Sequence, residues 1–268
     1  MTRSSRWMVW LFGGIAVVLI LLKSLSMLAD YYWFSAMGQA PVFITVLLTR
    51  LFLGLGVGVV FFLWLFWNVR LARRRLPEGV VLIGRRLLTD EERQQVEQYL
   101  DRVLLIFCLI GGIMVGLVAS GHWLDWLHFR NAVDFGYKDP LFHRDASFYV
   151  FRLNMLLYLW RVLFYGFAVA FVACALVYFY QEAIRVVGNA VHALPHARAH
   201  CLLLLAGGLV AKAIGYRLDQ FRLVFSPRGE VFYGACYADV MGRLPVMWIL
   251  LGLCLVGAII CAASLRSR

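Results

Sequence analysis

The sequence predicts an all-α polytopic membrane protein, because of its composition and the length of its apolar runs. Of the 268 residues, 63% are hydrophobic and only 15% are charged, whereas an average soluble chain is about 45–50% apolar and about 25% charged. Apolar runs near or above about 18 residues, long enough for a helix to cross a bilayer, recur along the whole chain. Backbone amides are too costly to leave unpaired in hydrocarbon, so each run must be helical. The composition therefore excludes a water-soluble protein.

Six transmembrane helices are expected, forming a single bundle over residues 1–268. The predicted spans are 7–29, 41–69, 103–121, 153–180, 201–217 and 245–265. The first span is too long for a signal peptide and lacks a suitable cleavage site, so we interpret it as a retained anchor. The fifth helix has two alternative starts, because Pro195 is also well suited to a first helical turn.

The basic residues predict the orientation of this bundle. The net charge is +11, but the lysines and arginines lie mostly at the ends of apolar segments and not on one face with stacking aromatics, which argues against a nucleic-acid partner. With a cytoplasmic amino terminus, the inner segments carry more of them than the outer segments. Cytoplasmic loops are enriched in Lys and Arg. We therefore expect a multi-pass membrane protein with both termini in the cytoplasm.

The inner segment between the second and third spans predicts a helical extension. A basic tract over residues 70–86 is followed by Thr89 and Glu92, which have the spacing of a capping box. Asp90 and its acidic neighbours also favour the positive end of a helix. An amphipathic helix over residues 90–102 should therefore lead into the third span.

Residues 122–152 and 218–244 are expected to lie outside, and we refer to these two segments as the cap. Both are rich in aromatic and charged residues. In HWLDWLHF, residues 122–129, the tryptophans and leucines share one helical face, which predicts a short helix in the membrane interface. The sequence Ser-Pro-Arg-Gly at 226–229 is typical of a type I turn and suggests a hairpin that pairs 222–225 with 230–233.

Four cations, Lys23, Arg50, Arg161 and Lys212, lie within apolar stretches, whereas no Asp or Glu lies inside any predicted span. A proton or sodium relay in the membrane normally needs a carboxylate, so a proton-coupled transporter is not favoured. At about 1.5 Å of rise per residue, the first three reach the outer boundary. Lys212 stands only about 16 Å above a helix start at residue 201, but about 25 Å above a start at Pro195.

Two interpretations of these cations remain open. In the first, the side chains snorkel to the outer boundary and pair with aspartates of the cap, namely Asp125, Asp134, Asp139, Asp219 and Asp239. In the second, they converge on an anion such as a phospholipid headgroup, a polyprenyl phosphate or an acidic envelope polymer. Guanidinium groups bind phosphate through two parallel hydrogen bonds, and lysine adds a compact charge.

Other motifs indicate packing and not a cofactor site. Gly54 with Gly58, and Gly112 with Gly116, form G-x-x-x-G pairs that predict close packing of the second and third helices, with homo-oligomerisation as the alternative. His192, His196 and His200 recur at every fourth residue, but Pro195 interrupts a helix there, and no cysteine or carboxylate completes a metal shell apart from the neighbouring Cys201. We predict no metal, no cofactor and no extracellular disulfide, and the oligomeric state is not predicted.

Three segments carry a family resemblance: DYYWFSAMGQAPVFITVLLTRL, FRNAVDFGYKDPLFHRDASFYVFRL and KAIGYRLDQFRLVFSPRGEVFYGACYADVMGRLPVMWIL. They resemble the amino-terminal membrane region of uncharacterised protein family 0182, large bacterial integral membrane proteins with no assigned activity. The resemblance covers nearly the whole chain. It implies a further transmembrane helix and a large domain outside the membrane in full-length members, so we expect this chain to be either a fragment or a short relative.

No catalytic constellation is found in the sequence, and we predict that the chain is not an enzyme. The expected function is a structural, anchoring or assembly module of the bacterial cell envelope, with membrane lipids and other membrane or envelope proteins as partners. The alternative is an anion- or lipid-handling protein, such as a transport subunit, that uses the outer Lys and Arg residues.

Overall fold

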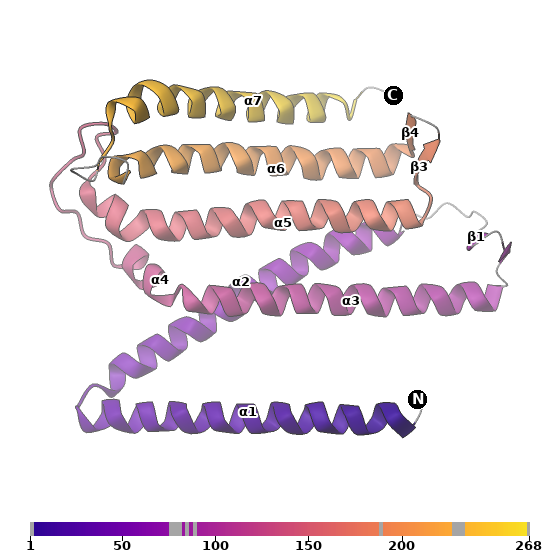
Figure 1. Ribbon diagram of the computed structural model, residues 1–268, viewed down its shortest axis with the longest axis horizontal. Coiled ribbons are helices and arrows are strands. Elements are labelled where there is room, and N and C mark those ends of the chain that lie inside the picture. Colours follow the sequence, from indigo (N-terminus) through magenta and orange to yellow (C-terminus); the bar gives the residue numbers. More distant parts are fainter. Residues whose placement is uncertain are drawn as a thin grey trace. The chain divides into compact units, whose positions relative to one another are not determined.

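The computed structural model describes residues 3–74, 82–83, 86–87, 90–187, 190–226 and 234–266, and long helices dominate it (Figure 1). The α-helices are α1 (Arg3–Ala36), α2 (Ala40–Arg74), α3 (Asp90–Gly121), α4 (Trp123–Arg130), α5 (Leu153–Tyr180), α6 (Pro195–Phe221) and α7 (Leu244–Ala263). Two π-helical turns, η1 (Phe148–Arg152) and η3 (Asp239–Arg243), and one 3-10 turn, η2 (Arg222–Phe225), adjoin them. The predicted all-α class is confirmed.

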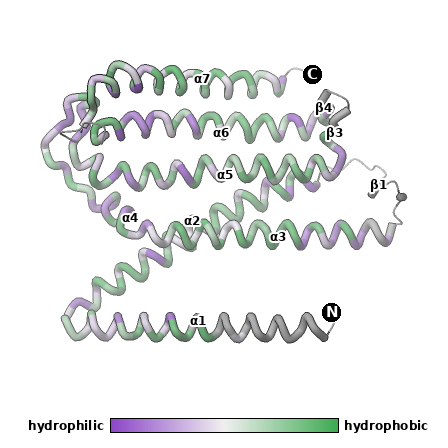
Figure 2. Tube along the Cα trace, in the orientation of Figure 1, coloured by the Kyte–Doolittle hydropathy of each residue, from purple (hydrophilic) through white to green (hydrophobic). Residues whose placement is uncertain are grey.

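Five helical segments are long and apolar enough to cross a membrane. They are Ala40–Arg73, Gln94–Gly121, Phe148–Tyr180, Pro195–Phe225 and Asp239–Ala263, and they coincide with the second to sixth predicted spans. Hydrophobic residues dominate the middle of α5 and of α7 (Figure 2). The 34-residue helix α1 covers the first predicted span, and its crossing of the membrane stays a prediction.

The chain divides into two compact units, Met1–Phe52 and Leu53–Arg268, so that α2 contributes to both. In the first unit, α1 ends at a glycine turn. Gly38 has a φ of +72°, its N–H donates to the carbonyl of Ser35, and the N–H of Gln39 donates to the carbonyl of Phe34. This is the Schellman pattern, in which a glycine adopts the left-handed conformation at low cost. Gly38 therefore ends α1 and lets α2 begin two residues later.

In the second unit, α6 packs against both α5 and α7, and the three helices lie side by side (Figure 1). The core contains fully buried side chains of α2, α5 and α6, among them Leu65, Cys174 and Leu204. Other large apolar side chains on these helices, such as Leu63, Leu176 and Leu203, are exposed, as expected for a surface that faces lipid.

The second half of α2 and helix α3 approach each other through glycines. A Cβ atom on Gly58 would lie 2.9 Å from the carbonyl oxygen of Gly112, and one on Gly116 would lie 2.6 Å from that of Gly54. Contacts below 3.0 Å are essentially never made by real Cβ atoms. The two G-x-x-x-G pairs thus allow the two backbones of one chain to touch, as small residues do between membrane helices.

A small antiparallel hairpin precedes α6 and was not predicted from the sequence. Its strands β3 (Ile184–Val187) and β4 (Ala190–Ala193) pair with Ile184 opposite Ala193. A second pair of short strands, β1 (Leu82–Ile83) and β2 (Arg86–Leu87), lies in the basic tract between α2 and α3. The all-helical prediction is therefore incomplete at these two connections.

Several predicted boundaries can be compared with the structure. α6 begins at Pro195, the earlier of the two alternatives, and α3 begins at Asp90 as expected. The hairpin expected over 222–225 is wrong, because this segment continues α6 as the 3-10 turn η2. Residues 227–233 lie outside the described residues, as does the predicted capping box at Thr89 and Glu92.

Candidate functional site

The four cations singled out in the sequence have different surroundings. Lys23 on α1 and Arg50 on α2 belong to the first unit and are exposed, and so is Arg161 on α5 in the second unit. Lys212 on α6 is half-buried. Of these four cations, Lys212 is therefore the one that the packing partly encloses.

Aromatic rings surround the ammonium group of Lys212. Its Nζ lies 4.9 Å from the ring centroid of Tyr216, 5.4 Å from that of Phe164 and 5.8 Å from that of Trp160. Such contacts are worth about 0.5–1 kcal/mol each at exposed sites and about 2 kcal/mol when desolvated. In the described part of the chain, no carboxylate pairs with Lys212. The rings compensate the charge in place of the predicted aspartates.

The packing of α5 on α6 positions these rings. The indole Nε1–H of Trp160 donates a 2.7 Å hydrogen bond to the carbonyl of Ala211. The indole also lies directly against Gly215, where any Cβ atom would overlap it. Because Trp160 and Phe164 are four residues apart on α5, both rings point at the same stretch of α6.

The aspartates of the cap are bound by groups close to them in sequence. Asp125 pairs with His122 at 2.8 Å, Asp219 with Arg222 at 3.2 Å and Asp239 with Arg243 at 3.1 Å, and Asp134 accepts a 3.2 Å hydrogen bond from the hydroxyl of Ser147. The expected pairing of these groups with the four intramembrane cations stays a prediction that none of these contacts supports.

Asp139 organises one turn of the cap. It is 5% exposed and accepts backbone N–H groups from Leu141, Phe142 and Arg144 at 2.7–2.9 Å, and the hydroxyl of Tyr149 at 2.7 Å. Burial alone would raise the pKa of Asp139, but these hydrogen bonds outweigh it and hold the pKa below its ordinary value. The carboxylate of Asp139 therefore has a structural role, and its two oxygens already accept four hydrogen bonds.

Asp145 has the same role six residues later. Its oxygens accept N–H groups from Phe135, Gly136 and Ser147 at 2.8–3.0 Å. The N–H of Phe135, followed by the groups of Ser147 and Gly136, lowers the pKa of Asp145 to about 2. Asp139 and Asp145 thus explain the two acids within FGYKDPLFHRDASFY: two carboxylates hold this loop.

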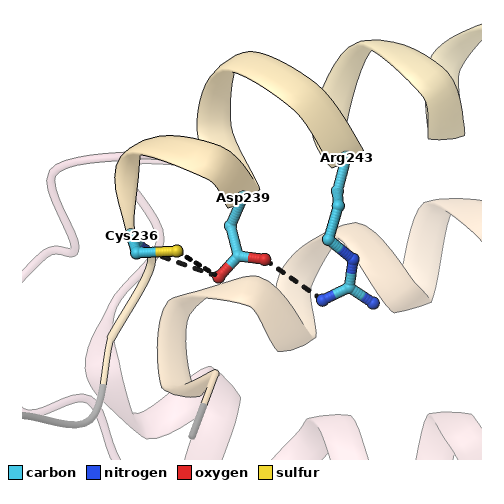
Figure 3. Close-up of polar contacts among 3 residues, drawn as sticks. All are labelled: Cys236, Asp239 and Arg243. Carbon is cyan, nitrogen blue, oxygen red and sulfur yellow. Dashed lines mark hydrogen bonds and ion pairs between the residues drawn. The ribbon is translucent and has the colours of Figure 1, made fainter. Parts of the chain in front are cut away.

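The second half of the cap is built on a fully buried carboxylate (Figure 3). One oxygen of Asp239 accepts the N–H of Cys236 at 3.5 Å and its thiol at 3.3 Å, and the other accepts the guanidinium of Arg243 at 3.1 Å. These three residues lie within η3 and the turn before it, and they set the start of α7. Asp239 is 0% exposed, so the ion pair anchors this turn from inside.

A buried polar network at the other end of α6 was missed in the sequence. His200 on α6 lies 2.9 Å from the hydroxyl of Tyr178 on α5 and 3.2 Å from Oδ1 of Asn68 on α2. The amide group of Asn68 donates to the carbonyl of Trp64 at 2.7 Å. Since Oδ1 can only accept, Nε2 of His200 must carry a proton, while Nδ1 shares a hydrogen bond with the hydroxyl of Tyr178. The network joins three helices through one imidazole.

The histidine repeat is thereby divided. His192 lies on β4, whereas His196 and His200 lie on α6. Among the residues that the structure describes, no group of three or more His, Cys, Asp or Glu side chains is placed to hold a metal ion. Although they are spaced four residues apart, the three histidines therefore do not share one helical face.

The fold defines the class of the protein: a helical protein with several helices that are long and apolar enough to cross a membrane. The chain belongs to the Uncharacterised protein family (UPF0182), whose family model matches residues 7–268. It is 33% identical to the UPF0182 protein of Frankia alni, over 89% of this chain and 23% of the relative. It is 32% identical to that of Salinispora arenicola, over 97% and 26%, and 31% identical to that of Mycobacterium tuberculosis, over 100% and 27%.

The chain thus spans about a quarter of the length of these curated relatives. The family resemblance seen in the sequence is confirmed. No activity is named for the family or for these relatives. No solved structure matches the chain.

Proposed function

We propose that the chain is a structural, anchoring or assembly module of the bacterial cell envelope and not an enzyme. The observation that carries this proposal is that three carboxylates of the cap are engaged in hydrogen bonds within their own segments. Asp139, Asp145 and Asp239 each accept several hydrogen bonds from their own segment. Carboxylates engaged in this way hold a surface in shape and leave little capacity for acid–base chemistry.

The inner membrane is the proposed location, with both termini in the cytoplasm and the cap outside. The distribution of basic residues along the sequence supports this orientation. The cap then faces the periplasmic side, where exposed aromatic side chains such as Tyr137 and Tyr237, 70% and 79% exposed, are available to an envelope protein. Membrane lipids would surround the helices.

The alternative function, anion or lipid handling through Lys23, Arg50, Arg161 and Lys212, has weaker support. An open polar path to Lys212 would favour it, whereas close packing around the lysine favours the structural module. Three rings lie within 6 Å of the ammonium group. This close packing around Lys212 favours the structural module. Lys212→Met should therefore leave the retention of anionic lipid by the purified protein unchanged, and a clear loss would favour lipid handling instead.

The test of the anchoring role is the size of the native complex. The full-length protein would be crosslinked in its bacterial host, extracted in mild detergent and analysed by native electrophoresis and mass spectrometry. We expect a discrete assembly larger than the protein alone. Tyr237→Ala in the cap should weaken it, whereas Ile259→Ala, which removes a similarly exposed apolar side chain from α7 (67% exposed), should not. Migration as the isolated protein under all conditions would refute the proposal.

A further inference from the structure

Arg217 on α6 is a half-buried cation that is held by rings and has no acidic partner among the described residues. Its guanidinium carbon lies 4.7 Å from the ring centroid of Phe221, 5.1 Å from that of Trp248 on α7 and 5.8 Å from that of Phe142 in the cap. In the described part of the chain, its one hydrogen bond to another side chain goes to Gln220, at 2.7 Å. A guanidinium has five N–H donors, and among the described residues this hydrogen bond engages one of them.

Gln220 adds a second unmatched donor beside Arg217. Its side chain is 0% exposed, and its Oε1 accepts the hydrogen bond from Nη1 of Arg217. Because the guanidinium can only donate, this contact fixes which end of the amide faces Arg217. The Nε2 group of Gln220 then has no hydrogen-bond partner among the described residues. Buried donors without acceptors are rare in proteins and point to a missing partner.

Nearby carboxylates do not supply that acceptor. Asp219 pairs with Arg222, Asp239 pairs with Arg243, and the oxygens of Asp139 accept Tyr149 and three backbone N–H groups. As far as the described residues go, the region therefore holds a positive charge and a buried amide NH₂ group with too few acceptors for them. What would complete it is an external anion with several oxygens.

We propose that Arg217 and Gln220 form a binding site for a phosphate-bearing anion. The planar guanidinium matches two oxygens of a phosphate group, and the amide of Gln220 donates to a further oxygen. The rings of Phe221, Trp248 and Phe142 fix the guanidinium plane and displace water from it, which strengthens the interaction with the anion.

The depth of the site agrees with this chemistry. Arg217 lies 22 residues after Pro195, where α6 begins, which corresponds to about 33 Å of helix at about 1.5 Å per residue. The hydrocarbon core of a bilayer is about 30 Å thick. A helix that crosses the membrane from Pro195 thus carries Arg217 to the level of the lipid headgroups. Both a lipid phosphate and a free phosphate ion can reach that level.

This proposal does not depend on the anchoring role, because the site could be occupied in a protein with or without an envelope partner. It also differs from the four cations chosen in the sequence. Lys212 lies on the same helix but has only rings around its charge, without an unmatched polar group next to it in the described residues. Lys212 is therefore the matched control for Arg217.

The test is a titration of the purified full-length protein in neutral detergent with two probes, short-chain phosphatidylglycerol and inorganic phosphate. We expect saturable binding of at least one probe by calorimetry, weakened at least about tenfold in Arg217→Gln because the charged hydrogen bonds are lost. Lys212→Met should bind as the wild type does. Binding of the lipid alone identifies a headgroup site, and binding of both probes shows that the phosphate group is sufficient.

Gln220→Glu provides a second variant that keeps the shape of the buried side chain. Its carboxylate should pair with Arg217 and occupy the place of the anion, so that binding of either probe is abolished while the melting temperature is unchanged or raised. Equal binding in the wild type, Arg217→Gln and Gln220→Glu would overturn the proposal, as would the absence of saturable binding in the wild type. If Arg217→Gln does not fold, Gln220→Glu decides between these outcomes.

Discussion

The cap and the core around His200 use buried polar groups in opposite ways. In the cap, the partners of Asp139 lie within ten residues of it in the sequence, so the carboxylate shapes its own segment. In the core, Asn68 and His200 are 132 residues apart, and their contact exists only when α2 and α6 are already packed. The first arrangement can form locally, whereas the second reports on the assembly of the helices.

The largest effect is expected in the core. His200→Ala leaves the hydroxyl of Tyr178 and Oδ1 of Asn68 without this partner and opens a cavity, so it should lower the free energy of unfolding by about 3 kcal/mol. Thermal unfolding in detergent measures the change. His196→Ala is the control, because His196 lies on the same helix and its Nε2 has no hydrogen-bond partner in the described residues. A similar loss of unfolding free energy in both variants would show that the hydrogen bonds of His200 add no stability beyond the packing of a histidine side chain.

A smaller effect is expected in the cap. Asp139→Asn removes the charge that four donors share, and hydrogen bonds to charged groups contribute about 1.5–3 kcal/mol each, partly retained by the amide oxygen. We expect a loss of about 2 kcal/mol, with increased proteolysis of the 134–147 loop and little change in the membrane helices. Asp134→Asn, which removes an exposed carboxylate with one 3.2 Å contact, should be nearly neutral. Global unfolding at the same rate as loop cleavage would contradict a local role.

The two regions should also act independently. Because His200 and Asp139 share no partner in the part of the chain that the structure describes, the losses in His200→Ala and Asp139→Asn should add within about 0.5 kcal/mol in the double variant. A larger coupling energy in a thermal double-mutant cycle would show that the cap and the core unfold as one unit, and the contrast between them would then be lost.

The smallest effect concerns pH. The pKa of Asp145 is about 2 in the folded cap and about 3.9 in an unfolded chain. A lowered pKa stabilises the folded form at pH values above the unfolded pKa, and this contribution disappears as the pH falls through the folded pKa. The cap loop should therefore stay protected at pH 5 and open between about pH 4 and pH 2. Protease protection as a function of pH tests this, and Asp145→Asn should remove the dependence on this group.

The sequence was sufficient for the helices that depend on long apolar runs. Five predicted spans coincide with membrane-length helices, and α3 begins at Asp90. The hairpin of β3 and β4 was missed, although a Gly-Asn pair between valine-rich runs is a known hairpin signal. Each strand is only four residues long, far shorter than the apolar runs that predict membrane helices.

The contacts of the site could be predicted only in part. Tyr216 follows Lys212 by four residues, so their proximity on one helix face was visible in the sequence. The contact of Trp160 with Lys212 depends on how α5 packs on α6. The contact of Asn68 with His200 depends on how α2 packs against these helices. No periodicity in a single sequence encodes which faces of separate helices meet.

The bare α-carbon of Gly215 has a mechanical consequence for α6. With the indole of Trp160 seated against it and hydrogen-bonded one turn away at Ala211, α6 cannot turn about its long axis or slide along α5 without a side chain striking the indole. The contact of Trp160 with Gly215 and Ala211 therefore fixes the rotation of α6 about its long axis. The directions of the Lys212 and Arg217 side chains depend on this rotation of α6. Gly215→Ala, which adds one methyl group, should therefore move both charged groups.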